Sequence, residues 1–128
     1  MLKLCFAMAL LLIGCDKKNK NPNCEKYEQV PVVEVDAPDS GTINNDIPVG
    51  VTFVVFNGCG QFGKFEESIE KKLVSIKLIA KYSGCICTDD IPRRTTTYHF
   101  NASTPGVYIL QFEGARNTPA VSDTITVE

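Results

Sequence analysis

Apolar and polar residues alternate along most of the chain that follows residue 24. In the segment 73–82 most of the side chains at every second position are apolar, with lysine and serine among the residues between them. A period of two, in segments rich in β-branched and aromatic residues, is typical of strands with one buried face. The same pattern recurs at residues 30–35, 47–56, 95–100, 106–112 and 123–128. We expect each of these segments to form a strand.

Turn-forming residues separate the alternating segments. Gly, Pro, Asn, Asp and Ser cluster at residues 39–41, 57–58, 83–84, 104–106 and 117–119, and these residue types favour turns. With a weaker strand at 61–69, the chain has about seven strands joined by short connections. This spacing predicts an all-β, about seven-stranded immunoglobulin-like sandwich over residues 24–128. The segments TPGVYILQF and SDTITVE resemble the last two strands of bacterial immunoglobulin-like domains.

Residues 64–81 also fit a helix. Their apolar side chains recur at helical spacing, and Glu67 and Lys71 stand four positions apart, as in a helical ion pair. An α+β fold with a helix near 64–81 is therefore the alternative. We favour strands because the later half of the segment alternates cleanly and its neighbours are strand-like.

The N-terminus carries a targeting signal. Lys3 precedes an uncharged run of ten residues, 4–13, which is long enough for a signal peptide but short of the about 20 that cross a membrane. The run ends in LIGC, residues 12–15, which resembles the lipobox of bacterial lipoproteins. The resemblance implies that residues 1–14 are a signal peptide that is removed, and that Cys15 carries a diacylglyceryl thioether.

A polar tether follows the predicted lipid anchor. Residues 16–23 contain no apolar residue except Pro22, so residues 15–23 form a lipidated cysteine and a spacer of about 25–30 Å when stretched. The membrane is thus an expected partner, through the anchor. We expect the outer membrane or the cell surface in preference to the inner membrane. Asp16 resembles an inner-membrane retention signal of some bacteria, so that alternative stays open.

Composition narrows the class of protein. An apolar content of 44% with 22% charged residues is that of a globular domain. A formal charge of −2 lacks the basic excess of nucleic-acid-binding proteins. Six cysteines in 128 residues indicate an oxidising compartment.

Four cysteines remain in the predicted domain. Cys24 stands at its start, Cys59 lies in an NGCG turn, and Cys85 and Cys87 lie in a GCICT segment; these motifs resemble small, uncharacterised bacterial lipoproteins with no known activity. We expect two disulfides, in which Cys59 pairs with one of Cys85 and Cys87 and Cys24 pairs with the other. The alternatives are a Cu(I) site at the Cys-x-Cys pair, completed by Cys59 or His99, and free thiols.

Other chemistry is sparse in the sequence. His99 is the only histidine and stands between the inward-facing candidates Tyr98 and Phe100, so we expect it on the surface. Asp89 and Asp90 lie in a polar loop that does not favour acid–base chemistry. No serine sits in a nucleophile elbow and no glycine-rich loop opens a helix. We therefore expect no enzyme, no catalytic or metal-binding residues and no cofactor.

The sequence thus predicts a membrane-anchored exported lipoprotein that acts as a non-catalytic binding or structural module of the bacterial envelope. One alternative is a periplasmic Cu(I)-binding or thiol-redox protein that uses Cys85 and Cys87. The other is a cell-surface adhesin or a subunit of an envelope complex, which would expose an apolar patch to a protein partner.

Overall fold

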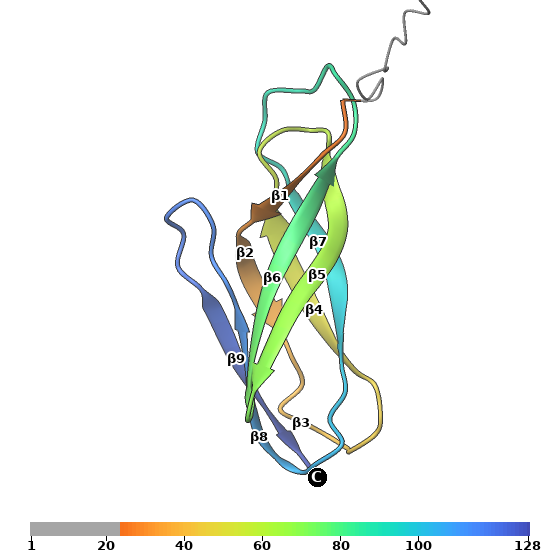
Figure 1. Cartoon of the computed structure of the whole chain (residues 1–128), viewed down its shortest axis with the longest axis vertical. Helices are drawn as coiled ribbons and strands as arrows, with labels where there is room; N and C mark the ends of the chain where they lie inside the picture. The colour runs from red at the N-terminus through yellow and green to blue at the C-terminus, as the bar shows by residue number, and fades with distance from the viewer. Residues whose placement is uncertain (1–23) are drawn as a thin grey trace, which may run out of the picture.

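The computed structural model describes residues 24–128, which form two β-sheets packed face to face (Figure 1). The predicted signal peptide, Cys15 and the tether lie outside the described residues. Nine strands make up the two sheets: β1 (Lys26–Val30), β2 (Val32–Asp36), β3 (Ser40–Gly41), β4 (Ile47–Val54), β5 (Gly60–Glu70), β6 (Leu73–Tyr82), β7 (Arg93–Phe100), β8 (Gly106–Phe112) and β9 (Val121–Val127).

The two sheets differ in width. The larger has six strands and the smaller has three, in the order β2-β4-β7. In the larger sheet, β5 pairs with β6 along its length. The other edge of β6 is shared, because β8 pairs with its first residues, Leu73–Ile76, and β1 pairs with Leu78–Tyr82. β9 and β3 extend the sheet beyond β8.

Most neighbouring strands run antiparallel, but two pairs are parallel. β6 and β8 are parallel because β7 lies between them in sequence and belongs to the smaller sheet. β3 and β9 are parallel as well. The hairpins β5–β6 and β8–β9 and the whole smaller sheet are antiparallel.

The core lies between the sheets and is built from the alternating positions of their strands. On β6 and β8 the inward side chains are almost completely buried, while their neighbours along the strand face solvent. Aromatic rings connect the two sheets, since Tyr98 on β7 meets Phe112 on β8 edge to face at 5.7 Å. The largest fully buried side chains are Phe53, Phe112, Ile76, Leu78, Leu110 and Ile125.

The predicted all-β sandwich is confirmed, but with nine strands where the sequence predicted about seven. The predicted first strand, 30–35, is interrupted at Pro31, which has no N–H to donate to a sheet. The chain changes sheets there, so β1 and β2 are separate strands. β3 is a two-residue strand within a segment predicted to be a turn.

The alternative helix at 64–81 is wrong. These residues belong to the β5–β6 hairpin, whose turn at 71–72 places Lys71 in the left-handed region, at a φ of 57°. Ile69, which belongs to the apolar face of the helix, is 59% exposed, whereas the alternating residues of β6 are buried. Residues 24–128 hold no helix long and apolar enough to cross a membrane.

The alternation on β8 gives a direct test of the register. Leu110 is fully buried and Ile109, next to it, is 42% exposed on the outer face. Leu110→Ala should lower the free energy of unfolding by about 2–5 kcal/mol, because it leaves a cavity between the sheets. Ile109→Ala should cost less than about 1 kcal/mol. Urea unfolding followed by circular dichroism, with the disulfides intact, measures both; equal costs would contradict the register.

Candidate functional site at the disulfide end

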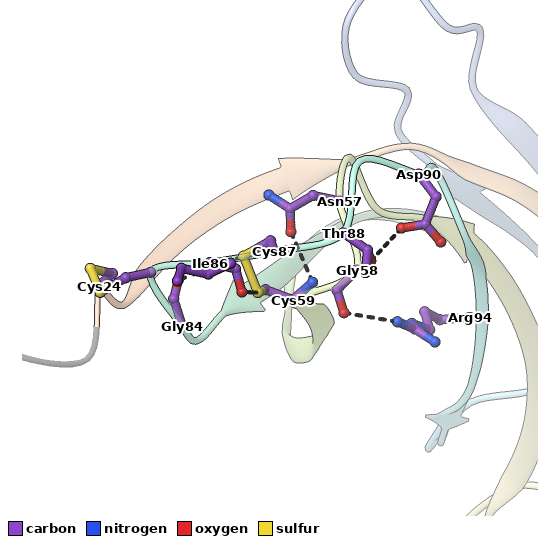
Figure 2. The surroundings of a disulfide bond; sticks show 11 residues. Cys24, Asn57, Gly58, Cys59, Gly84, Ile86, Cys87, Thr88, Asp90 and Arg94 are labelled. Atoms are coloured by element: carbon purple, nitrogen blue, oxygen red, sulfur yellow. Dashed lines mark hydrogen bonds between the residues drawn. A yellow bond between two sulfur atoms is a disulfide. The ribbon is translucent and has the colours of Figure 1, made fainter.

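Two disulfides gather the predicted cysteines at one end of the sandwich. Cys24 is bonded to Cys85, with their Cα atoms 5.0 Å apart, and Cys59 is bonded to Cys87, with Cα atoms 5.4 Å apart. The bridges join the start of the domain and the turn 57–60 to the loop 83–92, which connects β6 to β7 (Figure 2). We call these three segments the disulfide cap.

The turn 57–60 folds through its asparagine and its glycines. The Asn57 side-chain oxygen accepts a hydrogen bond from the Cys59 N–H at 2.9 Å, and the Asn57 carbonyl accepts one from Gly60 at 3.2 Å. A Cβ on Gly58 would lie 1.8 Å from Oγ1 of Thr88, and one on Gly60 would lie 2.5 Å from Cβ of Val55. The two glycines of NGCG therefore stand where the side chains of neighbouring segments leave no room for a Cβ.

The loop 83–92 is held against this turn by hydrogen bonds as well as by sulfur. The Gly58 N–H donates to the Thr88 carbonyl at 3.0 Å, and the Thr88 hydroxyl donates to Asp90 at 2.6 Å. Gly84 has a φ of +121°, a conformation that other residues rarely adopt. The loop therefore has a defined conformation, in which Ile86, between the two bridged cysteines, is 96% exposed.

Arg94 at the start of β7 completes the cap. Its Nε donates to the Gly60 carbonyl at 3.2 Å and its Nη2 donates to the Gly58 carbonyl at 3.3 Å. The guanidinium thus supplies hydrogen-bond donors to two carbonyl groups of the turn 57–60. Sequence reasoning missed this role, because an arginine beside a threonine-rich strand carries no signal that distinguishes it from a solvated one.

A second arginine secures the strand next to the cap. The guanidinium of Arg116 lies 3.5 Å from the ring centroid of Phe56 and forms an ion pair with Glu28 on β1. Lys26 also pairs with Glu28, at 3.3 Å. Partial burial raises the pKa of the Glu28 carboxyl, but the hydrogen bonds from Arg116 and Lys26 outweigh that effect and lower the pKa overall.

The cap offers little chemistry beyond its bridges. Each of its four sulfur atoms is bonded to another sulfur, so none is a thiolate ligand or nucleophile in this state. His99 is not brought to the cysteines: it lies near the far end of β7, about 20 Å along the strand, where its Nδ1 is 2.9 Å from Asp46. Within the described part of the chain, no three His, Cys, Asp or Glu side chains gather to hold a metal ion.

Comparison with known proteins identifies a family of domains. The model of a family described as the ORF11 beta-sandwich domain matches residues 49–127, which is more than half of the chain. The matched region begins in β4 and ends in β9, and it includes three of the four bridged cysteines but not Cys24. No curated protein and no solved structure matches the chain.

The bridges should contribute much of the stability of the domain. They close loops with sequence separations of 61 and 28 residues, and the chain-entropy model assigns about 4 kcal/mol to each. Reduction of both bridges should therefore lower the melting temperature by about 30 °C or more, at about 4 °C for each kcal/mol lost. Calorimetry with and without a reductant measures the fall.

The two bridges determine which peptides stay linked after proteolysis. Proteolysis under non-reducing conditions should release one peptide pair joined through Cys24 and Cys85 and another joined through Cys59 and Cys87. The double variant Cys59→Ser, Cys87→Ser should keep the first pair. Thiol titration of protein that is isolated without reductant and then denatured is a further test. Two or more free thiols would contradict the two disulfides and favour the copper or redox alternative.

Proposed function

We propose that this chain, which belongs to the ORF11 beta-sandwich domain family, is an exported bacterial lipoprotein whose sandwich is a non-catalytic binding or structural module of the cell envelope. The description of the family names a fold and no activity. The observation that carries this proposal is the junction at Cys15. There an apolar run of signal-peptide length ends in LIGC and passes directly into Asp16 and a lysine-rich tether.

The disulfides support export. Disulfides persist in oxidising compartments and are rare in the cytosol, where thiol reductants keep cysteines reduced. Both bridges lie in one cap, and Cys24 and Cys85 come from segments far apart in the sequence. A domain organised in this way is suited to the periplasm or the cell surface.

The position of the cap fits a lipid anchor. Cys24 lies in the cap, and eight residues separate it from Cys15. The C-terminus lies at the opposite end of the sandwich (Figure 1). In the proposed arrangement the cap is therefore the end nearest the bilayer, and two or more acyl chains on Cys15 provide stable attachment. We place the protein in the outer membrane or at the cell surface in preference to the inner membrane.

A non-catalytic role is supported by the surroundings of the one histidine. His99 and Asp46 form a pair of the kind that orients a catalytic base, but their side chains are 64% and 56% exposed. Two surface hollows are present, one lined by threonines on the outer face of β4 and β7 and one acidic beside β5. Neither is lined by His99 or Asp46. An exposed pair without a hollow to hold a substrate is typical of a surface ion pair.

The envelope-complex or adhesin alternative has one observation in its favour. Apolar side chains on β5 remain accessible, with Ile69 59% and Phe62 36% exposed. Such side chains on an edge strand suit contact with another protein. The copper or redox alternative has less support, because it requires the Cys85 and Cys87 sulfurs to be released from their bridges.

Mass spectrometry of the protein from native membranes tests the anchor. We expect a mature N-terminus at Cys15 that carries a diacylglyceryl group and partitions into detergent, since the acyl chains prefer an apolar phase. Cys15→Ser should abolish lipidation and membrane retention, whereas Cys5→Ser, in the segment to be removed, should change neither. An unmodified Cys15, or cleavage at another position, would refute the lipoprotein assignment.

A further inference from the structure

β5 is one edge of the larger sheet and the longest of its edge strands. Among the described strands it pairs only with β6, so its other edge presents backbone N–H and C=O groups that no strand occupies. On the same side of the sandwich, the smaller sheet ends at β7 (Figure 1). An edge strand of eleven residues is a ready template for an additional strand.

Only the second half of this edge is accessible in a regular geometry. A β-bulge interrupts the pairing with β6 between Phe62 and Lys64, and the Gly60 carbonyl is occupied by Arg94. From Lys64 to Glu70 the pairing is regular, so these seven residues offer about 23 Å of straight edge. We call the segment Lys64–Glu70 the acidic edge.

The inward face of the acidic edge is apolar at both ends and lies partly uncovered. Phe65, Glu67 and Ile69 pair with residues of β6 that are fully buried, so they face the smaller sheet. Phe65 reaches the ring of Tyr98 on β7, at 5.1 Å between centroids. Ile69, at the other end of this face, is 59% exposed.

The charge of this segment is negative. It carries one lysine against three glutamates, a net charge of −2. Lys64 pairs with Glu66 at 3.4 Å, and Glu67 accepts a hydrogen bond from the Tyr98 hydroxyl. On the outer face, Glu66 also borders a shallow hollow that includes Glu113. The edge therefore combines two apolar contacts, four residues apart, with carboxylates between and beside them.

We propose that the acidic edge binds an extended, cationic segment of another protein as an added strand. Apolar side chains four positions apart in that segment would cover Phe65 and Ile69, and basic side chains would face Glu67 and Glu70. Main-chain hydrogen bonds would provide affinity and the alternating side chains would provide selectivity. This proposal deepens the binding role proposed above and does not depend on the lipid anchor.

Charge argues against a second copy as the occupant. Two acidic edges side by side would bring a charge of −2 against a charge of −2, and like charges on facing strands are destabilising. The same carboxylates that discourage self-pairing attract a basic strand, so they select between partners.

A designed peptide tests the proposal on the full-length protein in mild detergent. The probe is a nine-residue peptide with two valines four positions apart and lysines and threonines elsewhere, carrying a fluorescent label. We expect saturable binding by anisotropy, with amide chemical-shift changes concentrated on the acidic edge and on β7. A peptide with glutamate in place of lysine should not bind, and N-methylation of alternate amides along the pairing side should abolish binding by removing the main-chain donors.

Ile69→Lys should weaken binding by about tenfold or more, because it removes an apolar contact and adds a repulsive charge. Ile109→Lys, which alters an exposed isoleucine on the outer face of β8, should leave affinity within about twofold. Unchanged affinity in Ile69→Lys, equal binding of the N-methylated peptide, or shift changes away from β5 would overturn the proposal. A dimer in sedimentation that Ile69→Lys dissociates would overturn it in favour of self-pairing. Lipidation of Cys15 is measured separately, by mass spectrometry. A failure of the lipoprotein hypothesis can therefore be told apart from a failure of the strand-addition hypothesis.

Discussion

The contact between a six-stranded sheet and a three-stranded one governs this structure. Where the two sheets overlap, the alternating side chains of β4, β6, β8 and β9 are buried against one another and supply most of the hydrophobic stabilisation. The inward side chains of β5, at the edge of the larger sheet, are only partly covered: Phe65 packs against Tyr98, whereas Ile69 is 59% exposed. The difference in width between the two sheets thus leaves the inward face of β5 partly exposed. The apolar side chains there, Phe65 and Ile69, are of the same kind as those buried in the core.

The disulfide end is built on other interactions. There the strands have ended, and the turn 57–60 and the loop 83–92 bury little apolar surface. Sulfur bonds, the Arg94 guanidinium and the hydrogen bond from Gly58 to Thr88 hold these segments together. Small domains have a thin hydrophobic margin, and covalent bonds between loops limit the entropy that the unfolded chain can regain.

Sequence patterns were sufficient for the fold class because a period of two is legible wherever one face of a strand is buried. They placed Tyr98 and Phe100 inward, and they restricted the disulfides to two pairings, between which the structure selects. They could not give the parallel pairing of β6 with β8, since that depends on which sheet β7 joins. Phe65 and Ile69 are four positions apart, a spacing that places two side chains on one face in a helix and in a strand alike. Only the alternating burial of β6 distinguishes the strand from the helix in this segment. Arg94 and the acidic edge depend on neighbours far away in sequence, and no local pattern encodes them.

The Cys24–Cys85 bridge has a mechanical consequence. A pulling force applied to the chain before Cys24 and opposed at the C-terminus passes from Cys24 through the sulfur atoms directly to Cys85. Residues 25–84, which include β1 to β6, lie inside the covalent loop and cannot be drawn out while the bridge is intact. Only the strands after Cys85 can be extended, so β1 is protected from being peeled off β6 by tension on the N-terminal chain.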